Sequence, residues 1–287
     1  MRMTRIVALI PLLFPPLAAA SPIFVSNEWF IEDGGTYNVN SSVNNNAYEV
    51  QSGTLNILPG ADIPFVSAYG YGNGAFISMS GGQVERGILV SQGNLTVSGG
   101  QSRGWDSSSD VGGDGVNVSY QSSAQITGGT FIGGNSSVQA GSGIVNGVAG
   151  KLFLSTLKIS GGTFIGGTGS GDYYGGSTGA SLLSMGNTTV TGGHFLSPIE
   201  INAAYGGATD FLGTHLTYQN NILSGILQNG DPIHVQIYPE NADATVNASG
   251  TEVSFLPISS IPEPTSALIF GLLTTLVLAR RRSHRSR

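Results

Sequence analysis

The chain contains no cysteine, and only 10% of its 287 residues are charged. Without cysteine there is no disulfide framework, no thiolate zinc site and no cysteine nucleophile. A helical period is also missing between residues 21 and 261, where the sequence is rich in glycine. Each glycine inside a helix costs about 1 kcal/mol relative to alanine, so this composition favours strands and turns. The length allows one or two domains with a sizeable core.

Basic residues are scarce between the two ends of the chain. Of the 11 Lys and Arg residues, only Arg86, Arg103, Lys151 and Lys158 lie between residues 6 and 279. Set against 17 acidic residues, these four leave that segment with a net charge of −13. Such a surface repels polyanions, so we expect no nucleic-acid partner. No motif indicates a cofactor.

Residues 1–20 have the pattern of a secretory signal peptide. A basic start is followed by the apolar stretch Ile6 to Leu17 and by Ala18-x-Ala20, which fits cleavage before Ser21. The alternative is a buried first strand, which the basic flank and the prolines disfavour. We therefore expect an exported protein.

Residues 259–287 combine three features in a fixed order. Pro262-Glu263-Pro264 precedes an apolar span at 265–279, and the tail at 280–287 begins with Arg280, Arg281 and Arg282. A span of 15 residues is shorter than the roughly 20 that cross a bilayer comfortably. Its arginines favour a cytoplasmic tail with the rest of the chain outside. The alternative is an ordinary C-terminal membrane anchor.

This order resembles the PEP-CTERM sorting signal of exopolysaccharide-producing Gram-negative bacteria. The resemblance implies that exosortase, a membrane transpeptidase, recognises Pro262, Glu263 and Pro264 and processes the chain nearby. It also implies transient anchoring through the C-terminal helix and a final place in the cell envelope, at the cell surface or in the extracellular matrix.

Between the ends, one short phrase recurs at intervals of 18 to 33 residues. Polar and apolar residues alternate before a Gly-Gly pair, which is typical of a half-buried strand followed by a sharp bend. After the bend, Phe131, Phe164 and Phe195 are expected to point inward and stack. The clearest copies are ISMSGGQV, LTVSGGQS, AQITGGTFIGG, LKISGGTFIGG and TTVTGGHFLS, centred on Ser80, Ser98, Thr127, Ser160 and Thr191.

The repeat predicts an all-β fold, a right-handed parallel β-solenoid (β-helix) of about eight coils over residues 21–208. It resembles the SGGTF-type strand repeats of autotransporter passengers, over residues 33–200. The alternative is a β-sandwich with glycine-rich hairpins. Residues 209–258 change character and predict an antiparallel cap, with a turn at Asn229-Gly230-Asp231. A separate binding module is the alternative for this segment.

Several aromatic residues lie beside Gly, Asp or Ala in expected loops. Flat rings with a polar tip can stack on sugars, although local packing is the commoner role of such residues. We take Trp105, Tyr173 and Tyr174 as the candidate glycan contacts. The wider set is Tyr69, Tyr71, Trp105, Tyr173, Tyr174 and Tyr205.

Asp106, Asp110 and Asp114 occur at four-residue spacing and are weak candidates for calcium ligands. A solvated acidic loop is the preferred interpretation, so we assign no metal. Ser102 and Ser177 each fit G-x-S-x-G, yet no strand-turn-helix setting surrounds them. No pair of acids is marked for glycoside chemistry. We therefore assign no catalytic residues.

Together these features predict an exported, exosortase-processed, non-catalytic structural protein of the cell surface or exopolysaccharide matrix. Its expected partners are exosortase and exopolysaccharide. A glycan-binding adhesin or matrix lectin is the first alternative, and a polysaccharide lyase or hydrolase is the second.

Overall fold

The computed structural model describes residues 23–25, 28–42, 47–70, 74–147, 154–171 and 179–258, and every regular element in these ranges is a β-strand. Within them, no helix has the length and apolarity needed to span a bilayer. The expected signal peptide and sorting signal lie outside the described residues.

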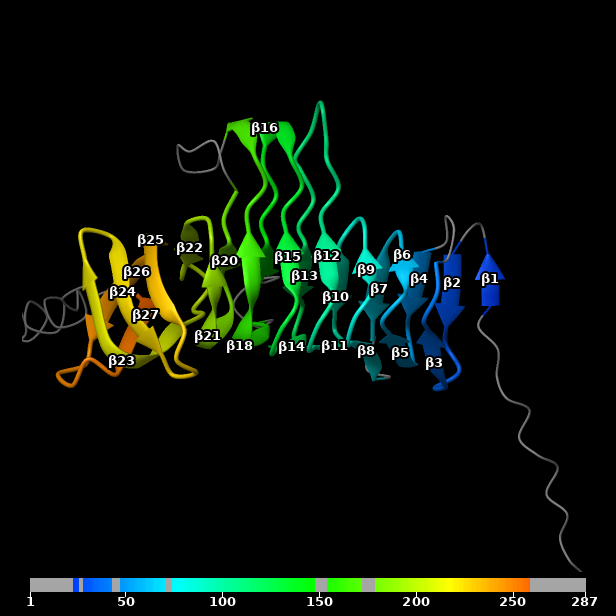
Figure 1. The fold of residues 1–287 in the computed structure, drawn as a ribbon, viewed down its shortest axis with the longest axis horizontal. Helices are drawn as coiled ribbons and strands as arrows, with labels where there is room; N and C mark the ends of the chain where they lie inside the picture. The colour runs from blue at the N-terminus through cyan, green and yellow to red at the C-terminus, as the bar shows by residue number, and fades with distance from the viewer. Residues whose placement is uncertain are drawn as a thin grey trace, which may run out of the picture.

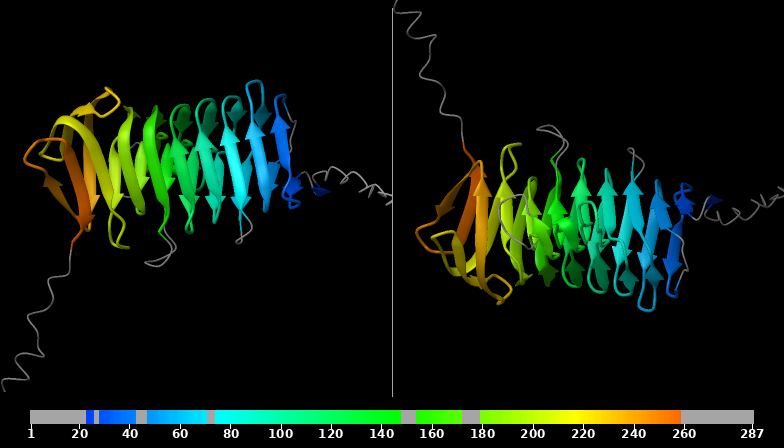
Figure 2. Two further views of the ribbon diagram at one scale, coloured as in Figure 1. Left: turned by 90° about the horizontal axis from the view of Figure 1, so that it is seen from below. Right: turned by 90° about the horizontal axis from the view of Figure 1, so that it is seen from above.

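Twenty-five strands belong to one sheet that winds around the core in successive coils. Within each coil the chain passes along three faces, here called A, B and C, before it returns to face A one coil further on (Figures 1 and 2). Face A contains β2 (Glu28–Ile31), β4 (Ala47–Val50), β7 (Val66–Tyr69), β10 (Ile88–Ser91), β13 (Val116–Ser119), β17 (Ile144–Asn146), β20 (Leu182–Ser184) and β22 (Ile199–Asn202). At its N-terminal edge, β1 (Ile23–Val25) pairs antiparallel with β2.

Faces B and C are continuous in the later coils, where single strands bend across the corner between them. Face B contains β3 (Thr36–Val39), β5 (Gly53–Ile57), β8 (Ala75–Met79), β11 (Asn94–Val97), β14 (Ser123–Ile126) and the start of β18 (Thr156–Ile165), β21 (Asn187–Phe195) and β23 (Thr209–Gln219). Face C contains β6 (Asp62–Ile63), β9 (Gln83–Val84), β12 (Gln101–Arg103), β15 (Thr130–Ile132) and the ends of β18 and β21.

Neighbouring coils are joined by parallel pairing on all three faces. On face B, for example, β11 lies between β8 and β14 with no shift in register. The predicted all-β, mostly parallel, solenoid-like fold is therefore confirmed. A β-sandwich of hairpins is excluded because consecutive strands occupy different faces. The right-handed sense of the coil stays a prediction.

The repeat fixes which side chains enter the core. Alternate residues on face B point inward, and the register places equivalent residues directly above one another. One such column of buried residues consists of Ile57, Met79, Val97, Ile126, Ile159, Val190 and Phe211. Each coil is too small to enclose its own apolar side chains, so neighbouring coils complete the core by stacking.

The three predicted phenylalanines form a stack on face C. The ring centroids of Phe131 and Phe164 are 5.3 Å apart, and those of Phe164 and Phe195 are 5.1 Å apart. The interplanar angles are 13° and 15°. Phe164, in the middle, is fully buried. This confirms the predicted stacking of the three phenylalanines, each of which is the second residue after a Gly-Gly bend.

The Gly-Gly pairs form the corner between faces B and C. Gly162 has φ +104°, in the left-handed region that side chains disfavour. A Cβ on its neighbour Gly161 would lie 2.4 Å from the Thr127 carbonyl oxygen of the preceding coil. The corner therefore requires both glycines: Gly162 for its backbone conformation and Gly161 for the close approach between coils.

The C-terminal strands turn back on the last coils. Antiparallel pairing joins β23 to β24 (Ile222–Leu227), β24 to β25 (Pro232–Glu240), β23 to β27 (Glu252–Pro257), and β27 to β26 (Ala242–Val246). The start of β23 and the end of β25 also pair in parallel with β21 and β22. The segment thus continues faces A and B directly, as one sheet with the solenoid.

A turn covers the edge of face C at the same end. Asn229 donates its backbone N–H to the Thr191 carbonyl at 2.8 Å, and the Gly193 N–H donates to Asp231 Oδ2 at 2.8 Å. Hydrogen bonds from the Asn229 amide and from the Gly193 N–H hold the pKa of the Asp231 carboxyl below its usual range. The predicted turn thus satisfies backbone groups that the last strand of face C leaves open.

We predict that Phe164→Ala lowers the free energy of unfolding by about 3–5 kcal/mol, because it opens a cavity inside the stack. Urea denaturation of the purified protein measures this change. The matched control is Phe76→Ala, since Phe76 is 47% exposed on face B. Equal losses for the two variants would contradict the stacked core.

Candidate functional site

Three long connections leave the solenoid at the corner between faces C and A. Their outer parts, residues 105–112, 134–140 and 168–171, lie side by side and are called the fin (Figure 1). In the fin, β16 (Ser136–Gln139) pairs in parallel with β19 (Gly169–Gly171). Parallel bridges also join Ser107 to Ser136 and Val111 to Gln139. The variable spacing of the repeat is therefore concentrated partly at one corner, as expected from the sequence.

Glycines form the neck of the fin, where the outgoing and returning chains touch. A Cβ on Gly166 would lie 1.7 Å from the Gly179 carbonyl oxygen, and one on Gly134 would lie 1.9 Å from that of Trp105. These separations leave no room for any side chain. A zigzag of N–H to carbonyl hydrogen bonds crosses the neck from Gly113 to Trp105, Gly134 to Gly113, Gly141 to Gly134, Gly167 to Gly141 and Gly179 to Gly167.

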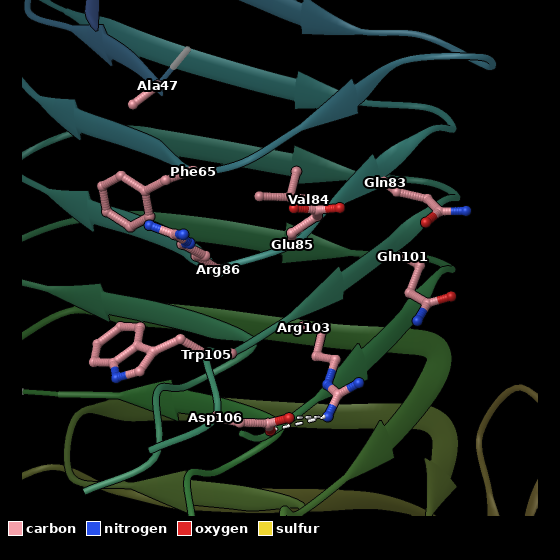
Figure 3. A pocket seen from close by; sticks show the side chains of 11 residues that line it. Ala47, Phe65, Gln83, Val84, Glu85, Arg86, Gln101, Arg103, Trp105 and Asp106 are labelled. Atoms are coloured by element: carbon pink, nitrogen blue, oxygen red, sulfur yellow. Dashed lines mark hydrogen bonds and ion pairs between the residues drawn. The ribbon is translucent and has the colours of Figure 1, made fainter. Parts of the chain in front are cut away.

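A groove of about 840 Å³ lies at the foot of the fin, along the same corner. It crosses several coils, from Ala47 at the start of β4 to Asp106 in the fin (Figure 3). Its lining combines aromatic, guanidinium, amide and carboxylate side chains. The lining residues are Ala47, Phe65, Gln83, Val84, Glu85, Arg86, Gln101, Arg103, Gly104, Trp105 and Asp106.

Trp105 forms the wall of the groove beside the fin, and 48% of the residue is exposed. Its ring packs against Gly113, because a Cβ there would lie 2.2 Å from Cε3 and 2.5 Å from Cδ2. The Gly113 N–H also donates to the Trp105 carbonyl at 2.9 Å. The indole is therefore supported on one side by backbone while much of it remains in contact with solvent.

Arg103 is held in place by an ion pair. Its Nη2 lies 2.7 Å from Asp106 Oδ2 and 2.9 Å from Oδ1. Asp106 Oδ1 also accepts the Asn135 N–H at 2.7 Å, which ties this pair to the second loop of the fin. Both arginine contacts use Nη2, so Nη1 and Nε stay available for a ligand.

Arg86 contributes a second guanidinium, which is exposed. Its backbone N–H donates to the Pro64 carbonyl at 2.7 Å, which fixes the turn after β9. Its side chain makes no hydrogen bond or ion pair within the described part of the chain. Figure 3 shows Phe65, Arg86 and Trp105 in one column along the groove, on successive corners of the solenoid.

The three weak calcium candidates are used separately in the structure. Asp106 pairs with Arg103, Asp110 accepts the Val111 N–H at 2.8 Å, and Asp114 accepts the Ser142 N–H at 3.0 Å. No three His, Asp or Glu residues in the described ranges are grouped so as to hold a metal. The aspartates therefore do not form one calcium loop.

Of the other candidate serines, glycan contacts and sorting residues, one lies in the core and the rest lie outside the described residues. Ser102 is fully buried and donates its hydroxyl to the Gly115 carbonyl at 2.6 Å, so it faces the core rather than a substrate. Tyr173 and Tyr174, like Ser177, lie outside the described residues. The same is true of the sorting residues Pro262, Glu263, Pro264, Arg280, Arg281 and Arg282.

The sequence analysis named Trp105 but missed its neighbours in the groove. A signal for them was present in the two copies SGGQVER and SGGQSRG. Aligned on their glycines, these copies place Gln83 beside Gln101, and the structure pairs these two residues directly. Glu85 and Arg103 follow at the next outward position. Arg86 and Trp105 then begin the two corners that flank the groove.

The chain was also compared with known proteins. No protein-family model, no curated protein and no solved structure matches it. The chemistry of the site thus rests on its own geometry.

Asp114 lies at the base of the fin and gives a prediction on pH. The residue as a whole is partly exposed, but its carboxyl group is enclosed, and burial raises its pKa above the usual 3.8. Well below pH 3.8 the group is neutral in both the folded and the unfolded state, so no charge is buried on folding. As the pH rises through the unfolded and then the folded pKa, the folded state must hold a buried charge and loses stability.

We therefore expect the Tm of Asp114→Asn, measured relative to that of the parent, to increase as the pH rises from about 3 to about 7. Asparagine can still accept the Ser142 N–H, so the fold is retained. Thermal melts at a series of pH values measure the difference. Asp110→Asn, which removes a charge from an exposed turn, serves as the control. Melting curves for Asp114→Asn that stay parallel to the parent at every pH would contradict the prediction.

Proposed function

We propose that this protein is an exported, non-catalytic structural component of a bacterial exopolysaccharide matrix. The observation that carries the proposal is the unbroken ladder of parallel strands that joins each coil to the next on three faces. A rod of this kind is stiff because every coil is hydrogen-bonded to both neighbours through its backbone. We also propose the right-handed sense, which parallel crossover connections strongly prefer.

The outer surface of the rod suits a hydrated polysaccharide. On face B, one outward column contains Asn38, Asn56, Ser78, Thr96 and Gln125 on successive coils. Within it, Asn56 Nδ2 donates to Asn38 Oδ1 at 2.8 Å. Uncharged amides and hydroxyls exchange hydrogen bonds with water and with sugar hydroxyls alike. The face therefore supports contact with the matrix at many weak points.

The location in a matrix rests on the sequence signals at the two ends. A signal peptide at 1–20 would export the chain, and the PEP-CTERM-like segment at 259–287 would deliver it to exosortase. The last described residue, Ile258, immediately precedes that segment and lies outside the sheet. Processing near Pro262 would therefore leave the folded rod complete.

A second candidate function is glycan binding by an adhesin or matrix lectin, and the groove beside Trp105 favours it. A polysaccharide lyase or hydrolase is less well supported. Asp106, Asp114 and Asp231 each accept hydrogen bonds from backbone N–H groups of the fold. These hydrogen bonds support a structural role for the three carboxylates.

We expect the purified protein to co-sediment with its host's exopolysaccharide without releasing new chain ends. Pull-down and a reducing-end assay, run on the same samples, measure the two properties. Phe164→Ala, which weakens the core, should retain less matrix. Steady release of chain ends that single Asp→Asn or Glu→Gln changes abolish would replace the structural role with an enzymatic one.

The sorting proposal predicts that replacing Pro262, Glu263 and Pro264 by alanine leaves the chain unprocessed and membrane-bound. Cell fractionation and the mass of the C-terminus in an exosortase-containing host measure this outcome. Pro257→Ala, just outside the motif, should be processed like the parent. Normal release of the triple variant would leave an ordinary C-terminal anchor as the better explanation.

A further inference from the structure

We propose that the groove at the foot of the fin binds a linear polysaccharide that carries carboxylates, with the glycan chain lying along the axis of the rod. The inference rests on the proposed function, because it names the matrix component that the rod would hold. Trp105, Arg86 and Arg103 are its central residues, and two neighbouring turns of the solenoid bring them to one surface.

The direction of the groove indicates a polymer rather than a single sugar. Its lining starts at Ala47, passes Phe65 and Arg86, and ends at Trp105 and Asp106. These residues belong to successive coils, and parallel strands are about 4.8 Å apart, so the groove extends roughly 14 Å along the axis. An extended chain of several sugar units follows such a line of regularly spaced contacts.

Trp105 supplies a surface for a pyranose ring. Its indole is braced against Gly113, so little conformational freedom remains to be lost when a ligand stacks on it. Flat, amphipathic rings of this kind provide apolar contact area together with a polar edge. Phe65, on an earlier corner of the same column, gives the groove a second apolar surface.

The guanidinium groups select for carboxylates. Arg86 is exposed and makes no side-chain contact in the described structure, so a ligand carboxylate can take both prongs of its fork. Arg103 keeps Nη1 and Nε free while Asp106 fixes its position. Gln83 and Gln101, paired on adjacent coils, add amide donors and acceptors for sugar hydroxyls.

The charge distribution of the chain favours this groove over the rest of the rod for an anionic polymer, since its two guanidinium groups balance the carboxylates of Glu85 and Asp106 there. The segment between residues 6 and 279 has a net charge of −13, which repels polyanions elsewhere on the rod. Three of its four basic residues lie in the described ranges, and two of these, Arg86 and Arg103, line the groove. Lys158 lies on face B instead, in the column of Gln125.

The test is binding of the purified, processed protein to polygalacturonate, measured by isothermal titration calorimetry and affinity electrophoresis. Methyl-esterified polygalacturonate is the matched probe, because it keeps the sugar backbone and removes the charge. We expect the affinity to fall about tenfold or more when the carboxylates are esterified. Arg86→Gln should lose a similar factor in affinity for the unesterified polymer. Trp105→Ala should lose binding to both polymers.

Two control variants are available on the same chain. Lys158→Gln removes a positive charge outside the groove, and Tyr205→Ala removes an aromatic residue that is 41% exposed in a different turn. Both should bind like the parent. Arg86 is on the surface, so Arg86→Gln should keep the parent's Tm, and its loss of affinity then reports the contact itself.

Three outcomes would overturn the inference: unchanged affinity in Arg86→Gln and Trp105→Ala, equal binding of esterified and unesterified polymer, or equally tight binding of polyglutamate. The last outcome would show attraction to charge without recognition of sugar. Failure of the groove is distinguishable from failure of the matrix role. If groove variants still co-sediment with the host's exopolysaccharide, only the groove inference is lost, whereas failure of the parent to co-sediment removes the matrix role.

Discussion

The structure depends on one constraint, the fixed spacing that parallel backbone hydrogen bonds impose between coils. Because strands on every face must keep the same separation of about 4.8 Å, each residue meets its own equivalent one coil away. This arrangement turns similar residues into ladders, such as the stacked rings of Phe131, Phe164 and Phe195. It also explains the glycine corners, since neither the spacing nor the path of the chain can widen to admit a side chain at Gly161.

The same constraint applies to polar residues inside the rod. Near the C-terminal end, Asn146 Nδ2 donates to Thr188 Oγ1 at 2.8 Å, and Ser184 Oγ lies 2.7 Å from Thr188 Oγ1 and 2.8 Å from Thr209 Oγ1. All four residues are buried. Each of these residues shares at least one hydrogen bond with a neighbour in this set, while the Asn146 Oδ1 atom is buried without a partner in the described structure. The final coil then needs partners of another kind, which β23, β25 and the Asn229–Asp231 turn provide.

More of the fold than of the site could be predicted from the sequence. Alternation around Gly-Gly was enough to predict parallel coils and the inward phenylalanines, because these features repeat in register. Face A has no such phrase, and its short strands emerge only from their pairing. The fin was not predictable as a paired unit, since β16 and β19 come from connections of different length and are aligned by the neck glycines. Trp105 could be chosen as a candidate from its residue type. Arg86 could not, because only its position at a corner of the solenoid places it in the groove.

The groove itself follows from a change in corner length between two consecutive coils. Between β9 and β10 the chain turns through Glu85, Arg86 and Gly87, which is a short corner. Between β12 and β13 the equivalent corner extends from Gly104 to Gly115 and rises into the fin. A step of this kind leaves a concave line where the short corners meet the wall of the first long one, and Trp105 is the first large side chain on that wall. A regular solenoid has flat faces, so it acquires a binding groove where its repeat is broken, and here the break coincides with two of the few arginines in an acidic chain.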